Sequence, residues 1–200
     1  MLASEVSFDP RPQMGRIFAE SYYQWLRHFS KNKDKLGRAF AHVFDLNQFF
    51  VAAQDDTIIG FAACTDGSKP IALHKKTLCK NLGFIVGRIA FMMLSKHLLN
   101  QTYPFEMTED AGEIAFVATA ENHRRKGIAE NLIRHILDAG VYLEYILEVA
   151  DNNEGAVRLY EKLGFTEFMR AKAPKQSGIN FFIYMVYRIG DTKGDHYEST

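Results

Sequence analysis

The stretch from Gly112 to Arg170 constrains the fold of this 200-residue chain more than any other part of it. It opens with an apolar, β-prone run from Glu113 to Thr119, which is typical of a mostly buried strand. After a basic turn the apolar residues change to the spacing of one helical face, at Ile128, Leu132, Ile133, Ile136 and Leu137. Gly140 is placed to end this helix, and residues 143–149 follow as a second strand. The order predicts a βαβ unit.

The turn that joins the strand to the helix, Arg124 to Ala129, is the part of this unit whose residues suggest a binding function. Its basic side chains stand directly before a glycine, Gly127, at the start of the helix. Free backbone N–H groups and the helix dipole favour negative charge at such a position. The turn therefore predicts an anion-binding site, and a solvated basic turn on a surface helix is the plain alternative.

At these residues the chain resembles the GNAT superfamily of acetyl-CoA-dependent N-acetyltransferases. The family signature Q/R-x-x-G-x-G/A corresponds to Arg124-x-x-Gly127-x-Ala129. A second block follows in the order and spacing of the family, at Asn153, Ala156, Tyr160 and Gly164-Phe165. The resemblance covers roughly the second half of the chain. It implies an α/β (α+β) fold, in which helices flank a mixed, mostly antiparallel central sheet.

The resemblance also implies an activity: transfer of the acetyl group of acetyl-CoA to a primary amine, by direct attack in a ternary complex. Acetyl-CoA would be the co-substrate, and no metal is expected. The backbone of Val117, Ala118 and Thr119 would pair with the pantetheine arm. The remaining cofactor residues that it implies are Arg124, Arg125, Lys126, Gly127, Ile128, Ala129, Asn153 and Ala156. Many family members have glycine where this chain has Arg125 and proline where it has Glu121, but neither difference removes a backbone donor.

Two side chains are implied as catalytic. Tyr160 matches a tyrosine that acts as general acid for the departing thiolate, with a packing tyrosine as the alternative. Glu113 lies eleven residues before Arg124, a spacing at which one branch of the family has its general base. An ordinary exposed glutamate at the start of a strand is the alternative.

The rest of the chain is expected to complete one domain, 1–200, with a helical insertion at about 66–108 and a polar, frayed tail at about 190–200. The insertion stands between a β-hairpin and the Glu113 strand. It is interpreted as a helix that packs on the sheet or covers one of its edges, with a substrate lid or a dimer surface as alternatives. The other expected elements are a strand at 5–8, helices at 12–29 and 33–42, hairpin strands at 49–53 and 58–64, a short helix at 153–163, and strands at 166–171 and 181–188.

Composition narrows the class of partner. Lys and Arg number 24, as do Asp and Glu, which argues against a general binder of nucleic acid or membranes. Cys64 and Cys79 show neither metal spacing nor a disulfide framework, so a cytoplasmic protein is expected.

A non-catalytic acyl-CoA-binding or protein-interaction module with the same fold is the rival hypothesis. The acceptor amine and the oligomeric state, including a homodimer, stay open.

Overall fold

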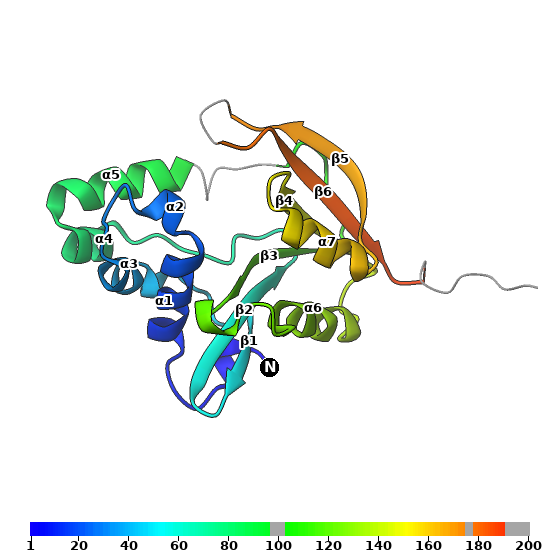
Figure 1. The fold of residues 1–200 in the computed structure, drawn as a ribbon, viewed down its shortest axis with the longest axis horizontal. Coiled ribbons are helices and arrows are strands. Elements are labelled where there is room, and N and C mark those ends of the chain that lie inside the picture. Colours follow the sequence, from blue (N-terminus) through cyan, green and yellow to red (C-terminus); the bar gives the residue numbers. More distant parts are fainter. Residues whose placement is uncertain (97–102, 175–177, 191–200) are drawn as a thin grey trace, which may run out of the picture.

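A six-stranded sheet forms the centre of the computed structural model, which describes residues 1–96, 103–174 and 178–190. The strand order is β1-β2-β3-β4-β6-β5 (Figure 1). The strands span β1 Phe49–Gln54, β2 Thr57–Thr65, β3 Ala111–Thr119, β4 Glu144–Ala150, β5 Thr166–Lys172 and β6 Phe181–Arg188. Among these described strands β3 and β4 pair in parallel, and every other pair is antiparallel. The predicted mixed, mostly antiparallel sheet is confirmed.

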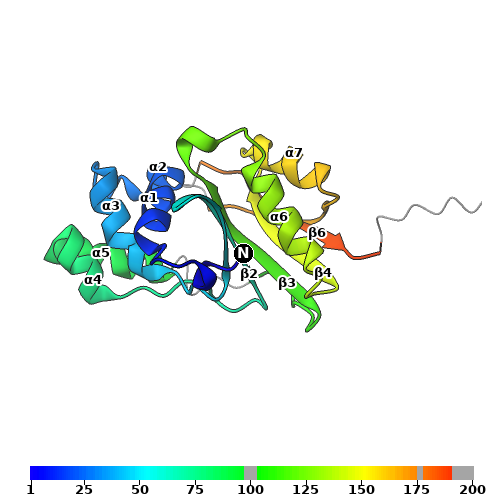
Figure 2. The same cartoon turned by 90° about the horizontal axis from the view of Figure 1, so that it is seen from below.

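Helices cover both faces of this sheet. Figure 2 shows α1 to α5 on one side of β2 and β3, with α6 and α7 on the other. Their bounds are α1 Arg11–Ser21, α2 Tyr23–Leu26, α3 Lys33–Phe40, α4 Lys75–Leu82, α5 Phe84–Leu94, α6 Ile128–Asp138 and α7 Glu154–Lys162. The four apolar residues that follow Ile128 in the predicted helical face are all buried against the sheet in α6. Gly140 adopts φ 60° just beyond α6, as a residue that ends a helix commonly does.

Three local expectations need correction. Residues 5–8 form no strand; the chain instead makes a 3-10 turn at Ala3–Glu5, where the Glu5 carboxylate accepts a hydrogen bond from the Leu2 N–H at 2.9 Å. The helix expected at 12–29 is interrupted at Tyr22, whose φ and ψ of −105° and 17° separate α1 from α2. The helical insertion is two helices, because Gly83 at φ 95° ends α4. Its residues 97–102 and the tail 191–200 lie outside the described part.

Close helix packing sets the position of α1 on the sheet. A Cβ atom added at Gly15 would lie 2.4 Å from the carbonyl oxygen of Gly37, so α1 and α3 meet backbone to backbone. The apolar residues of α1 then join the core on the β2 face, which includes Phe18, Phe49 and Phe61. This packing brings the α1–α2 junction, with Tyr22, against β3.

Candidate active site

The two central parallel strands separate soon after they begin to pair. Ala111, Gly112 and Glu113 of β3 pair with residues 144–146 of β4, and the pairing stops there. Beyond it, residues 114, 115, 118 and 119 pair with β2, on one edge only. The backbone groups that point toward β4 have no strand partner along this part of β3. The sheet therefore contains an internal edge, which we call the β3–β4 gap.

A β-bulge lies on the side of this gap formed by β3. Phe61 pairs with Ala118 and Ala63 pairs with Ala115, so two residues, Phe116 and Val117, stand opposite one residue of β2. Phe116 has φ 52°, a conformation that is uncommon for a bulky residue and costs of the order of 1–3 kcal/mol. Such bulges redirect backbone groups and occur often beside functional sites.

Two tyrosines reach the gap from opposite faces of the sheet. Tyr160 of α7 belongs to the core on the α6 side, and Tyr22 packs against the core on the α1 side, with its ring 6.4 Å from that of Phe116. Burial raises the pKa of Tyr160 to about 12. Burial also raises the pKa of Tyr22, and the nearby Tyr160 raises it further. Both hydroxyls are therefore protonated at neutral pH.

Tyr22 is a residue that sequence reasoning missed as part of a site. In the sequence it belongs to the apolar face of an expected helix, where an aromatic side chain is ordinary packing. Its ring stacks at 5.9 Å on that of Trp25, which is an exposed tryptophan. Its approach to Tyr160 depends on contacts between segments far apart in the chain, and no local pattern signals it.

Glu113 occupies the last paired position before the gap and is buried, with 9% of its surface exposed. Burial raises the pKa of its carboxyl, although a hydrogen bond from Tyr103 and the charge of Lys69 oppose the rise. The carboxylate oxygen Oε2 has no hydrogen-bond partner among the described residues. A glutamate exposed at the start of a strand, the plain alternative from the sequence, is therefore excluded.

Glu113 and Tyr160 are not brought together on one face. Side chains alternate along a strand, so Glu113 shares the face of Ala111, whereas Ile114 packs in the same core as Tyr160. Tyr184 of β6 and Tyr103 lie on the Glu113 side. Burial is the main cause that raises the pKa of both phenols; Glu113 raises that of Tyr103 further, and Glu148 adds to the rise in both. The two residues implied as catalytic therefore approach the gap from its two sides.

The basic turn has the shape that an anion requires. Gly127 is the N-cap residue of α6 at φ 79°, no side chain caps the helix, and nothing lies within 4 Å of the place of a Cβ. The first-turn N–H groups of α6, those of Ile128, Ala129 and Glu130, have no partner within the helix. Arg125 also has a positive φ of 59°, which explains why glycine suits that position. This uncapped, open helix end fits a diphosphate.

The turn is tied to the end of β3. The Arg124 Nε donates to the carbonyl oxygen of Thr119 at 3.4 Å, so the basic turn and the unpaired part of β3 form one continuous stretch. Asn153 caps α7, because its side-chain oxygen accepts from the Ala156 N–H at 3.4 Å. Ala156 packs at the edge of the core that contains Tyr160.

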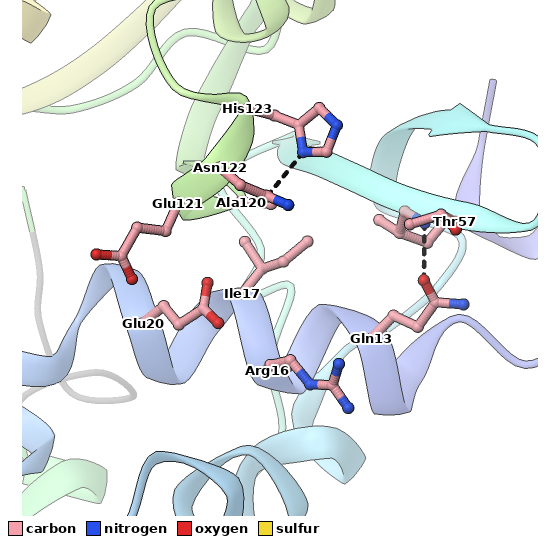
Figure 3. Close-up of a pocket in the computed structure, with 10 residues that line it drawn as sticks. Gln13, Arg16, Ile17, Glu20, Thr57, Ala120, Glu121, Asn122 and His123 are labelled. Atoms are coloured by element: carbon pink, nitrogen blue, oxygen red, sulfur yellow. Dashed lines mark hydrogen bonds between the residues drawn. The ribbon is translucent and has the colours of Figure 1, made fainter.

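A cavity of about 700 Å³ lies on the other side of this region, between α1 and the 3-10 segment Glu121–His123 (Figure 3). Gln13 of α1 holds one wall, since its side chain accepts from the Ile58 N–H at 2.8 Å and donates to the Asp56 carbonyl at 2.9 Å. The lining residues are Gln13, Arg16, Ile17, Glu20, Thr57, Ile58, Ala120, Glu121, Asn122 and His123. None of the implied cofactor residues is among them, and the sequence did not signal this cavity.

No group of three or more His, Cys, Asp or Glu side chains within the described residues is arranged to hold a metal ion. In the same part of the chain, no helix combines the length and apolar character needed to cross a membrane.

Residues 12–165 match the family model of the acetyltransferase (GNAT) family. N-alpha-acetyltransferase 30 of Schizosaccharomyces pombe (strain 972 / ATCC 24843) is 35% identical over 80 residues, which cover 38% of this chain and 53% of that protein. The match thus spans about half the length of that curated relative.

Solved structures show the same fold at low sequence identity. An N-acetyltransferase from Staphylococcus aureus Mu50 superposes with a TM-score of 0.60 at 18% identity, covering 90% of this chain and 96% of that one. An acetyltransferase of the GNAT family from Bacillus cereus ATCC 10987 gives 0.55 at 11% identity, covering 92% and 93%. The fold expected from the sequence is therefore found in solved proteins.

Proposed function

Because the chain belongs to the acetyltransferase (GNAT) family, it is an acyltransferase, and we propose that it transfers the acetyl group of acetyl-CoA to a primary amine by direct attack in a ternary complex. The family uses acetyl-CoA, which supplies an activated thioester. One observation carries the proposal: the unpaired part of β3 is followed, after a single 3-10 turn, by the uncapped N-terminus of α6, and the Arg124 side chain ties the basic turn to the end of β3. A long, narrow co-substrate with an amide arm and a diphosphate needs both features in that order.

The backbone holds the co-substrate in this proposal. The first-turn N–H groups of α6 bind the diphosphate, and Arg124, Arg125 and Lys126 add positive charge around it. Residues 117–119 offer their free edge to the amide arm, in the manner of an added strand. Asn153 and Ala156, at the start of α7, are proposed to contact the same co-substrate. Phe116 in the bulge redirects the neighbouring backbone, which supports a peptide N–H as donor to the developing oxyanion.

Tyr160 is the proposed general acid. The leaving thiolate is the conjugate base of a thiol with a pKa of ~8.5 in water. Proton transfer to it from a phenol with a pKa of about 12 would cost about 5 kcal/mol. A site without water removes most of this difference in pKa, because burial raises the pKa of a thiol as well. Cys64 illustrates this: burial, with a smaller contribution from Glu113, raises the pKa of its thiol to about 12. Cys64 pairs with Ile114, the first residue of β3 beyond the parallel pairing. A thiolate leaving in the same surroundings would therefore match Tyr160 in basicity.

Glu113 is the proposed general base for the amine. It stands at the point where the gap opens, its Oε2 lacks a hydrogen-bond partner in the described part of the chain, and its raised pKa brings it closer to neutral pH. The negative charge of Glu113 and Glu148 on this side also favours a cationic acceptor. The name of the fission-yeast relative makes the α-amino group of a peptide the first acceptor to test.

Calorimetric titration with acetyl-CoA, and separately with free CoA, tests the proposal first. Micromolar binding of acetyl-CoA, followed by acetylation of peptide N-termini or other amines, would support it. Binding without turnover on any amine would favour the non-catalytic acyl-CoA-binding module. No binding to a folded sample would contradict the assignment of the gap and the turn.

Replacing Glu113 with glutamine is expected to lower kcat/KM by about 10²- to 10⁴-fold and to change its pH profile. Only the ionised carboxylate accepts a proton, and the pKa of Glu113 is raised. The wild-type rate should therefore rise with pH through that raised pKa, and Glu113→Gln should lack this limb. The ionisation of the acceptor amine contributes equally to both profiles. Glu109→Gln is the control, because it removes the same charge from an exposed residue nearby and should leave the pH profile intact. Identical profiles for all three proteins would show that Glu113 is not the general base.

A further inference from the structure

The outer surface of α5 is almost entirely apolar. Six residues of this helix are exposed, and five of them are large hydrophobic side chains: Phe84, Ile85, Ile89, Met92 and Met93. Their exposed fractions run from 43% to 72%. The opposite side of α5 packs tightly, because a Cβ at Gly87 would lie 2.4 Å from the Cα of Cys79 in α4. We call this outer surface the α5 apolar face.

The charged residues of the segment that contains this face all have one sign. Residues 67–105 contain six Lys and Arg and no Asp or Glu, which leaves 18 Lys and Arg against all 24 Asp and Glu in the rest of the chain. The sixth exposed residue of α5 is Arg88, whose guanidinium lies 5.4 Å from the ring centre of Phe84. The exposed residues of α4 are Lys75, Lys76 and Lys80. Within the described part of the chain, none of these four cations forms an ion pair.

We propose that the α4–α5 hairpin docks this protein on an anionic lipid bilayer. An apolar helix face accompanied by cations is the arrangement that binds the interface of a bilayer with anionic lipids. The eleven residues of α5 span about 16 Å, about half of a hydrocarbon core, so the helix lies along the interface and does not cross it. This inference is independent of the proposed acetyl transfer.

A second copy of the chain fits this face less well. Symmetric pairing through α5 would bring the cations of both hairpins together, with no acidic side chain from residues 67–105 to offset them. A bilayer with anionic lipids supplies the opposite charge and the apolar layer at once. In Figures 1 and 2 the hairpin lies at the opposite end of the molecule from β5 and β6, so docking through it leaves those strands away from the surface.

Co-sedimentation with lipid vesicles tests the proposal on the full chain. The wild-type protein should bind vesicles of phosphatidylcholine and phosphatidylglycerol in equal parts at least about tenfold more strongly than vesicles of phosphatidylcholine alone. Binding should weaken as salt is added, because salt screens the cations. The double variant Ile85→Glu with Met92→Glu should lose binding to the mixed vesicles. Both positions are exposed, so thermal melting and acetyl transfer to a soluble amine should stay unchanged.

Val141→Glu with Leu143→Glu is the matched control. These residues are exposed hydrophobics, at 68% and 64%, in the loop between α6 and β4. This control should sediment with the mixed vesicles like wild type. The proposal is overturned if wild type does not bind the mixed vesicles, binds both kinds equally, or loses binding equally in both double variants. It is also overturned if α5 instead mediates a dimer, seen by light scattering, that the Ile85 and Met92 variant abolishes while vesicle binding is absent.

Discussion

Replacing Gly127 with valine is expected to raise the dissociation constant for acetyl-CoA by at least about 100-fold, measured by calorimetric titration. Gly127 has φ 79°, which a β-branched residue adopts only with strain, and its missing side chain leaves the N-terminus of α6 open. A valine would occupy the space that the diphosphate needs and would turn the first-turn N–H groups away. Hydrogen bonds to charged groups contribute about 1.5–3 kcal/mol each, so losing one or two accounts for the loss.

Gly140→Val separates loss of the site from loss of stability. Gly140 lies just beyond the other end of α6, has φ 60°, and likewise has nothing within 4 Å of a Cβ. Both variants should therefore lose about 1–2 kcal/mol of stability to the same backbone strain. Only the Gly127 variant should lose acetyl-CoA. Equal losses of affinity would point to a general weakening of α6, and normal binding by Gly127→Val would remove the turn from the site.

Tyr160→Phe is expected to lower kcat by about 10²- to 10⁴-fold with little change in KM, as the loss of a general acid does. The phenol is protonated throughout the physiological pH range, because burial raises its pKa to about 12. No hydrogen bond to the described residues holds its hydroxyl, so removing that hydroxyl should alter the melting temperature little. Steady-state kinetics with a thioester-release assay measure both parameters.

Tyr145→Phe provides the comparison within the same buried core. The hydroxyl of Tyr145 donates to the Ile136 carbonyl of α6 at 3.3 Å. Its removal should lower the free energy of unfolding by about 1 kcal/mol and leave kcat unchanged. Tyr160→Phe is thus expected to lower kcat and leave stability nearly unchanged, whereas Tyr145→Phe is expected to lower stability and leave kcat unchanged. A wild-type kcat for Tyr160→Phe would exclude Tyr160 as the acid.

Local patterns were enough to predict the unit from Glu113 to 149. A strand, a basic turn and a helix each leave a mark within a few residues, and the apolar spacing after Ile128 identified the buried face of α6 correctly. The resemblance to a family then supplied the mixed, mostly antiparallel sheet with flanking helices, which no periodicity could give; the order of the strands came only from the structure. Element boundaries failed mainly at 5–8 and at Tyr22, where side-chain hydrogen bonding and a single non-helical backbone conformation decide the outcome.

The parts that escaped prediction depend on distant contacts. The point where β3 and β4 separate is set by the pairing of residues some thirty positions apart. The positive φ of Phe116 could not be predicted either, because phenylalanine has no preference for that conformation. Glu113 is buried, and Tyr103, which hydrogen-bonds to it, comes from the predicted insertion. Net charge likewise describes the chain only as a whole, because a sum of zero includes a cationic segment, residues 67–105, in a chain that is otherwise acidic.

The short pairing of β3 with β4 has a consequence for how long the protein survives. Three residue pairs join the β1–β3 half of the sheet to the β4–β6 half, so a molecule seated in the gap would act as the missing connection between them. A ligand that binds only the folded state adds about 2.7 kcal/mol of stability at a concentration of 100 times its dissociation constant. Resistance to unfolding and proteolysis would then follow the supply of acetyl-CoA, and the enzyme would be most durable in cells rich in its co-substrate.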